Sequence, residues 1–328
     1  MNKRLTYIDT AKGIGILLVI LGHTYNISTA LHTFIYSFHM PLFFIISGMT
    51  YNKEKYSNYS LIPFIAKKAK SYLIPYLGFS VINLFLVYLW NIVFNHSTIR
   101  TKEIKNYING IFFCHADIQH MPNCTPIWFL LCLFWASILF YLIHKFASKY
   151  AIFIAIFSAL IGHVLTYFNI ELPWCLTRMF TALFFIQIGF SMKAFVHNHD
   201  FKYSDFIFLL LGLLATLIKG LTNSGNNYNI LHLLTAIFIS LFILLICKAI
   251  PTKKNGFLSW LGKNTLPIIG FNYFLRDLTT EIYYLFPLIR EITITWYVSF
   301  AITTLSCVLL IKITNKVKML FFKNRIVG

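Results

Sequence analysis

The chain has 328 residues, of which 58% are hydrophobic and only 12% are charged. This balance excludes an ordinary soluble globule and indicates a membrane protein. The formal net charge is +18, but the basic residues are scattered among apolar runs, so nucleic acid is not an expected partner. Anionic lipid headgroups and the excess of Lys and Arg in cytoplasmic loops explain the charge better.

Ten apolar runs of about 17 to 24 residues are long enough to cross roughly 30 Å of hydrocarbon. We therefore predict an all-α integral membrane protein, a bundle of about ten transmembrane helices. The predicted spans cover residues 10–26, 33–50, 72–95, 126–144, 150–168, 175–192, 205–222, 230–250, 257–275 and 294–313. The first run has some features of a signal peptide, but His23 and Thr24 interrupt its apolar core, so we expect it to be retained.

The basic residues divide unequally between the two sides that these spans define. One side holds nineteen Lys and Arg residues and the other holds six, with three more inside or at the edges of spans. Because cytoplasmic loops carry the excess, both termini are predicted to be cytoplasmic. No repeat or long linker is found, so residues 1–328 are predicted to form one transmembrane domain with no appended soluble domain.

The first span carries Lys12 and, eleven residues later, His23. At about 100° per residue the two side chains return to nearly the same helix face, about 16 Å apart along the axis. The second span carries His39, followed by Pro41, so its imidazole is predicted to lie near a helix kink and near the same end as His23. Ionisable groups in a membrane helix indicate a functional site, since burying them costs several kcal/mol unless something compensates.

Each of these groups has a chemical and a structural interpretation. A neutral His23 imidazole could accept the proton of an attacking hydroxyl, or it could be a structural hydrogen-bond partner. His39 could orient an acceptor, pair with His23 or serve packing. Lys12 could bind a phosphate or another substrate oxygen, pair with Asp9, or extend to the lipid headgroups.

Further cations and one tryptophan lie at the ends of other spans. Lys68 and Lys70, on the predicted cytoplasmic side, suit the phosphates of a nucleotide carrier, although inside-positive charge explains them equally well. Arg178 lies near the outer end of the sixth span, where it could hold a hydroxyl, a lipid-carrier phosphate or an oxyanion. Trp128, at the outer end of the fourth span, could stack on a sugar ring or anchor the helix at the interface.

The longest hydrophilic stretch, residues 95–125, is predicted to be an outer polar loop. It contains five potential metal ligands, which are Cys114, His115, Asp117, His120 and Cys124. Their spacing matches no zinc pattern, so no metal is expected. A disulfide between Cys114 and Cys124 remains an alternative if that side is oxidising.

Four motifs carry a resemblance to a known family. They are the Lys12-to-His23 spacing, F-H-M-P-L-F-F-I-I-S-G at residues 38–48, P-I-W-F-L-L at residues 126–131 and L-G-K-N-T-L at residues 261–266. In this combination the chain resembles the polytopic membrane O-acetyltransferases of acyltransferase family 3, most of all the fucose 4-O-acetylase-like branch. Lys12 stands where many members have Arg, and Asn272 stands where relatives often have His, so we assign no role to Asn272.

The resemblance implies an enzyme that moves an acetyl group from acetyl-CoA to a hydroxyl of a cell-surface or lipid-linked sugar, in the inner (plasma) membrane of a bacterium. The predicted catalytic residues are His23 and His39, and the predicted substrate-binding residues are Lys12, Lys68, Lys70, Arg178 and Trp128. The alternative is a non-enzymatic transporter or flippase of a glycan or glycolipid. Polar residues concentrate in the first two spans rather than along a path, which favours a reaction centre.

Overall fold

The computed structural model is 87% helical and has no strand in the part of the chain that it describes. The described residues are 5–93, 101–115, 120–121, 125–221, 230–250, 256–284 and 294–322. The prediction of an all-α membrane protein is confirmed.

Fifteen α-helices lie within the described residues. In chain order they are α1 (Thr6–Gly22), α2 (Thr29–Tyr36), α3 (His39–Met49), α4 (Lys53–Ser57), α5 (Leu61–Lys68), α6 (Ile74–Val93), α7 (Thr101–Phe113), α8 (Trp128–Phe146), α9 (Ala151–Tyr167), α10 (Leu176–Asn198), α11 (Phe206–Leu221), α12 (Ile230–Ala249), α13 (Phe257–Lys263), α14 (Thr265–Tyr284) and α15 (Trp296–Phe322). Shorter turns are the π-helix η1 (Ala69–Leu73) and the 3₁₀ turns η2 (Thr125–Ile127), η3 (Ser148–Tyr150), η4 (Pro173–Cys175) and η5 (Tyr203–Asp205).

Among the residues that the structure describes, seven helical segments are long and apolar enough to cross a membrane, so the chain is a multi-span membrane protein. They are Thr29–Met49, Leu61–Leu89, Thr125–Phe146, Ser148–Tyr167, Pro173–Asn198, Ile230–Ala249 and Trp296–Lys316. Helices α1 and α11, with 17 and 16 residues, are shorter than these segments. The count of ten spans and the cytoplasmic location of the termini remain predictions.

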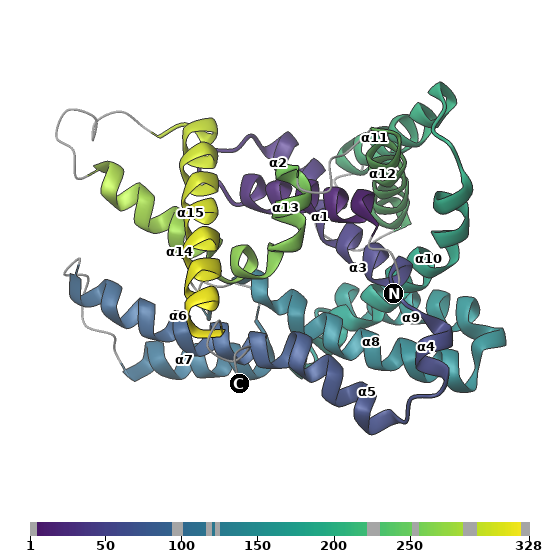
Figure 1. The fold of residues 1–328 in the computed structure, drawn as a ribbon, viewed down its shortest axis with the longest axis horizontal. Coiled ribbons are helices and arrows are strands. Elements are labelled where there is room, and N and C mark those ends of the chain that lie inside the picture. Colours follow the sequence, from purple (N-terminus) through teal and green to yellow (C-terminus); the bar gives the residue numbers. More distant parts are fainter. Residues whose placement is uncertain are drawn as a thin grey trace.

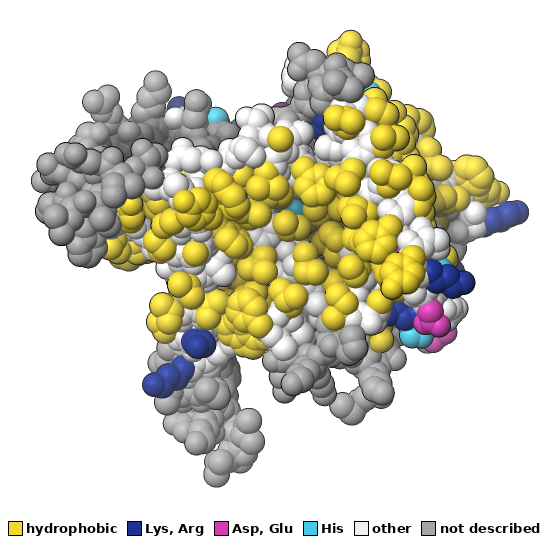
Figure 2. All heavy atoms as spheres, turned by 90° about the horizontal axis from the view of Figure 1, so that it is seen from above, with side chains coloured by type: hydrophobic (Ala, Val, Ile, Leu, Met, Phe, Trp, Pro, Cys, Tyr) yellow, Lys and Arg dark blue, Asp and Glu magenta, His cyan; other side chains and the backbone are white. Residues whose placement is uncertain are grey.

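Apolar side chains cover much of the outer surface. On α9, Phe153 and Phe157 are 68% and 64% exposed, and on α15 Leu305 and Leu309 are 63% and 59% exposed. Figure 2 shows hydrophobic side chains across the middle of one face, with the charged side chains that can be seen lying toward its margins. Surfaces of this kind are stable in lipid, where every helix satisfies its own backbone hydrogen bonds.

Two pairs of helices cross closely because glycines face backbone. A Cβ atom on Gly13 of α1 would overlap Leu258 of α13, and one on Gly262 of α13 would overlap the carbonyl of Asp9. The same reciprocal contact joins α3 and α10, through Gly48 and Gly189. The glycines of the S-G and L-G-K-N motifs therefore serve helix packing, as small residues do in membrane interfaces.

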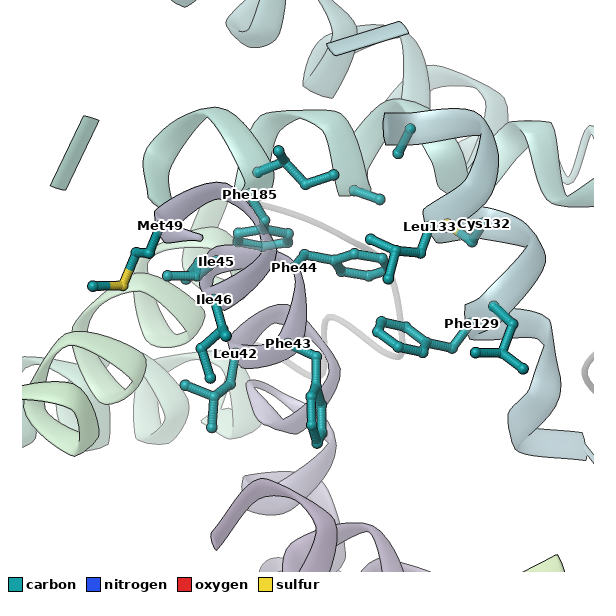
Figure 3. Packing of buried hydrophobic residues seen from close by; sticks show 14 of the residues in the cluster. Leu42, Phe43, Phe44, Ile45, Ile46, Met49, Phe129, Cys132, Leu133 and Phe185 are labelled. Atoms are coloured by element: carbon teal, nitrogen blue, oxygen red, sulfur yellow. The ribbon is translucent and has the colours of Figure 1, made fainter. Parts of the chain in front are cut away.

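The interior between α3, α8 and α10 is filled by aromatic and aliphatic side chains. The ring of Phe44 lies 4.9 Å from that of Phe129, and Phe43 lies 5.7 Å from the same ring. Figure 3 shows Phe44 and Phe129 extending toward each other from α3 and α8, with Leu133 and Phe185 close to Phe44. This packing fixes α3, which begins at His39, against the rest of the molecule.

The structure corrects three predicted element boundaries. The first helix ends at Gly22 rather than near residue 26, so His23 caps it. The second predicted span is divided into α2 and α3 at Ser37 and Phe38, and Pro41 lies in the first turn of α3, where its missing N–H is tolerated. The predicted polar loop contains α7, because Tyr107 is buried and its hydroxyl reaches the Ser80 carbonyl oxygen at 3.3 Å.

Candidate active site and substrate cavities

The His23 imidazole lies between two tyrosines that come from different helices. Its Nδ1 is 2.6 Å from the Tyr36 hydroxyl at the end of α2 and 3.1 Å from the Tyr273 hydroxyl on α14. The other ring nitrogen, Nε2, makes no hydrogen bond with a residue that the structure describes. A ring held through Nδ1 presents Nε2 for chemistry, as in sites where a second partner fixes the imidazole tautomer.

The turn that carries His23 is held by an arginine from α14. One guanidinium nitrogen of Arg276 donates to the His23 carbonyl oxygen at 2.9 Å, and two others contact the Asp277 Oδ1 atom at 2.7 and 2.6 Å. The guanidinium lies 4.4 Å from the ring centres of both Tyr25 and Tyr273. The Tyr25 hydroxyl also donates to Asp277 Oδ1, at 2.6 Å. These contacts fix the position of His23, which follows the last residue of α1.

His39 belongs to the same cluster but does not bond to His23. It is buried at the start of α3, its Nδ1 lies 2.8 Å from the Ile35 carbonyl oxygen, and its ring meets the Tyr36 ring at 4.9 Å. A carbonyl oxygen only accepts, so Nδ1 carries the proton and Nε2 is the basic nitrogen. Tyr36 thus contacts both of the histidines that were predicted to be catalytic. The two imidazoles lie near each other, as predicted, with the Tyr36 side chain in contact with both.

Lys12 is half-buried inside α1 and is separated from His23 by eleven residues, which corresponds to about 16 Å of helix. At that distance the ammonium cannot touch the imidazole. Asp9, three residues earlier, is 3% exposed. Lys12 therefore belongs to the opposite half of α1, as its predicted role with an acyl donor requires.

A small cavity contains Lys68 but not Lys70. Its volume is about 150 Å³, and it is lined by Ser47, Thr50, Tyr51, Tyr56, Lys68, Tyr72, Ser137, Phe140 and Ile186. The Lys68 ammonium lies 5.3 Å from the Tyr72 ring centre, whereas Lys70 is exposed within the π-helix η1. Ser47 lies eight residues after His39 on α3, about 12 Å along the axis, so one helix connects this cavity with the histidine cluster.

Arg178 and Trp128 are in contact, which the sequence did not predict. The guanidinium is 5.3 Å from the Trp128 ring centre and 4.0 Å from a carboxylate oxygen of Glu171. Arg178 lines a cavity of about 400 Å³ together with Phe113, Cys114, Thr166, Asn169, Ile170, Glu171, Leu172, Cys175 and Thr177. One face of Trp128 is occupied by the arginine, so a sugar ring would have to stack on the other.

One turn connects the surroundings of the two clusters. Helix α14, which carries Tyr273 and Arg276, contacts the turn η2, and Trp128, which contacts Arg178, follows that turn directly. The Lys68 cavity lies at the C-terminal end of α3, where Ser47, Thr50 and Tyr51 line it. Lys193 donates to the carbonyl oxygen of Tyr51 at 3.3 Å, and Lys53 donates to the Ser148 hydroxyl at 2.7 Å.

The comparisons with known proteins agree with the motif resemblance. A family model described as an acyltransferase domain matches residues 5–313. The chain belongs to acyltransferase family 3. It is therefore a membrane acyltransferase with a family-3 domain over nearly its whole length. No curated protein and no solved structure matches it, and the fucose 4-O-acetylase-like branch remains a prediction.

Sequence reasoning missed the residues that surround His23. Tyr36, Tyr273 and Arg276 were not predicted to be site residues. One signal was available, because Tyr273 and Arg276 are three residues apart and so share a face of α14. Nothing in the sequence indicated that this face meets α1.

The predicted outer loop also gains specific contacts. His115 pairs with Glu171 at 3.2 Å, and its ring lies 4.4 Å from that of His120. Cys114 is a free, buried thiol, while Cys124 and Asp117 lie outside the described residues. Because the structure has Cys114 as a free thiol, Cys114 does not form the disulfide with Cys124 that the sequence left as an alternative.

Proposed function

We propose that this acyltransferase moves an acetyl group from acetyl-CoA to a hydroxyl of a cell-surface or lipid-linked sugar, in the inner membrane of a bacterium. The observation that carries the proposal is the His23 imidazole, whose Nδ1 is held by two tyrosine hydroxyls while Nε2 faces no described partner. This is the arrangement that a general base requires. The family supports acyl transfer, and the donor and acceptor are our inference from the residues around the site.

In the proposed reaction His23 Nε2 takes the proton of the sugar hydroxyl while the hydroxyl oxygen attacks the thioester carbonyl carbon. Nδ1 stays protonated and donates to a tyrosine oxygen, so the imidazolium that forms keeps a hydrogen-bond acceptor. When the tetrahedral intermediate collapses, the carbon–sulfur bond breaks and Nε2 returns the proton to the departing sulfur. His39, through its contact with the Tyr36 ring, keeps that tyrosine in place.

The donor and the acceptor are assigned to the two cavities. Lys68, together with Lys70 and Lys12 of the predicted cytoplasmic half, suits the phosphates and the thioester end of acetyl-CoA. Arg178 and Trp128, with the polar lining of the larger cavity, suit a sugar that arrives from the other side. No metal is required in this scheme.

The test is release of free CoA by the purified protein in detergent, with acetyl-CoA and a mixture of envelope glycans as substrates. We expect turnover in the wild type, and a loss of about 10² to 10⁴ in both His23→Ala and His23→Gln, which is the usual contribution of a positioned base. His197→Gln is the matched control, since His197 is an exposed histidine at the end of α10. Near wild-type turnover in His23→Gln would assign His23 to structure.

A further inference from the structure

The wall of the Lys68 cavity contains a buried hydroxyl that the protein itself does not use. Ser137 lies in the middle of α8, is 5% exposed and lines this cavity of about 150 Å³. Its Oγ atom makes no hydrogen bond with any residue that the structure describes. A buried hydroxyl without a partner lowers stability, so a serine at this position is better explained by a ligand than by packing.

A second hydroxyl on the same wall shows the difference. Thr50 Oγ1 directs its proton to the carbonyl oxygens of Ile46 and Ser47, at 2.9 and 3.1 Å, so that proton is used within α3. The Ser137 hydroxyl has no such acceptor among the described residues. Because a serine hydroxyl turns about a single bond, it can direct its proton to a ligand oxygen in the cavity.

The cavity also contains a cation, and two aromatic rings hold its side chain. The Lys68 ammonium lies 5.5 Å from the ring centre of Phe64 and 5.3 Å from that of Tyr72. Lys68 directly precedes the π-helix η1, and Tyr72 belongs to it, a type of helical irregularity that is frequent at functional sites. Among the residues that the structure describes, those lining the cavity include no carboxylate. The charge of the wall therefore favours an anion.

The size of the cavity limits that anion to a small group. One water occupies about 30 Å³ of the liquid, so a cavity of about 150 Å³ has room for a phosphate group but not for a nucleotide. In a space of this size one phosphate can contact both Ser137 and Lys68. The ammonium and the hydroxyl are donors and the phosphate oxygens are strong acceptors, so the two sides match.

We propose that Ser137 is a further donor-binding residue, and that its hydroxyl and the Lys68 ammonium bind one phosphate group of the acyl-CoA. This inference rests on the proposed function, which supplies the acyl-CoA. The phosphate is the one attached to the pantetheine arm. Ser47 on the cavity wall lies about 12 Å along α3 from His39, and the extended arm is long enough to bring the thioester from there to the histidine cluster.

The test measures binding rather than turnover. The ligands are CoA, 4′-phosphopantetheine and pantetheine, each titrated into the purified full-length protein in detergent. Ser137→Ala should weaken the binding of CoA and of 4′-phosphopantetheine by about tenfold, the loss of one hydrogen bond to a charged group. Pantetheine, which has no phosphate, should bind the wild type and Ser137→Ala equally. Thermal unfolding should show no loss of stability, because the Ser137 hydroxyl has no described partner.

Ser240→Ala is the matched control. Ser240 on α12 is also fully buried, and its hydroxyl also has no partner among the described residues, but it lines neither the Lys68 cavity nor the Arg178 cavity. This variant should bind CoA as the wild type does. The two serines therefore differ in the cavity alone.

Four results would overturn the proposal, and they are distinguishable. Equal binding of CoA by the wild type and Ser137→Ala removes Ser137 from the donor site and leaves the proposed function intact. Equal weakening of pantetheine and 4′-phosphopantetheine shows that the hydroxyl binds the arm. An effect of Ser137→Ala on short-chain phosphatidylglycerol, with none on CoA, assigns the site to a lipid headgroup. A wild type that does not bind CoA contradicts the proposed donor as well.

Discussion

Two arginines on different helices, Arg276 on α14 and Arg178 on α10, make different kinds of contact, and the difference suggests a structural role for one and a binding role for the other. Arg276 has a side chain that is 12% exposed, makes contacts of 2.6 to 2.9 Å with Asp277 and the His23 carbonyl, and lies between two tyrosine rings. Arg178 has a side chain that is 29% exposed, stacks on one indole and meets Glu171 at 4.0 Å beside a cavity.

The donors of Arg276 are directed at the protein, so this arginine positions His23 and stabilises the site. The ion pair of Arg178 is long, and its partner Glu171 is 63% exposed, which makes it worth at most about 1 kcal/mol. A ligand anion or hydroxyl can replace Glu171 at small cost. We therefore propose a structural role for Arg276 and a substrate-binding role for Arg178, and the variants below test both roles.

The largest effect is expected from Arg276→Gln. It leaves Asp277 without its cation and removes the donor to the His23 carbonyl, so we expect stability to fall by about 2 to 3 kcal/mol, less than for a fully buried pair. Thermal unfolding in detergent measures the loss. Arg276→Lys, which keeps the charge, should lose less. Equal stability of Arg276→Gln and wild type would show that Asp277 and Tyr25 hold the turn alone.

A third cation, Lys12, extends the comparison to the half of α1 that lies away from His23. Lys12→Ala should weaken use of acetyl-CoA more than use of the acceptor, because a charge-assisted contact contributes about 1.5 to 3 kcal/mol. Steady-state kinetics with each substrate varied in turn separates the two effects. An unchanged apparent affinity and rate with acetyl-CoA would assign Lys12 to the headgroups instead.

The substrate-binding role of Arg178 is tested by Arg178→Gln. We expect the apparent KM for the acceptor to rise about tenfold, corresponding to the loss of one charge-assisted hydrogen bond. Unfolding stability should change by less than about 1 kcal/mol, the reverse of the pattern for Arg276. A large loss of stability with an unchanged KM would make Arg178 a structural residue like Arg276.

The smallest effect concerns a carboxylate far from both arginines. Asp205, between α10 and α11, accepts from the Lys202 N–H at 2.7 Å and contacts the His199 ring at 2.9 Å. Burial alone would raise the pKa of Asp205, but these hydrogen bonds outweigh it and lower the pKa below the usual 3.8. A lowered carboxyl pKa adds stability above 3.8 that is lost as pH falls through the lower value.

Thermal midpoints measured between pH 3 and pH 6 test this expectation. The wild type should lose stability on the acid side of pH 4, and Asp205→Asn should lack that part of the acid dependence, with a difference of under about 1 kcal/mol at pH 6. An identical acid limb in the two proteins would show that Asp205 does not contribute to it.

The motifs predicted the two histidines of the cluster but could not predict the tyrosine and arginine side chains of α14 that hold His23. His23 and His39 are recognisable because ionisable groups in apolar runs need a reason. Tyr273 and Arg276 lie on a helix of mixed composition, where one tyrosine and one arginine are unremarkable by pattern alone. Their role depends on the meeting of α1 and α14, whose contacting residues are about 250 positions apart.

The predicted boundaries of α7 and of the second span were wrong for a related reason. α7 contains Tyr107, Gly110 and charged residues that give no strong apolar run, and it forms because Tyr107 and the close approach of Gly110 to His120 pack it against neighbours. The division between α2 and α3 likewise depends on the Phe38 conformation, with ψ of −19° and φ of −144°. Neither is set by local propensity.

The sequence by itself determined the all-helical membrane class, the family and the histidines at which chemistry was expected, because apolar length and buried charge are local properties that lipid enforces. Only the tertiary structure decided which nitrogen of His23 is held, which arginine supports it, that Lys68 has a cavity and Lys70 does not, and that Cys114 and Cys175 line one cavity. Those facts follow from how helices pack, and packing brings together side chains that no spacing along the chain relates.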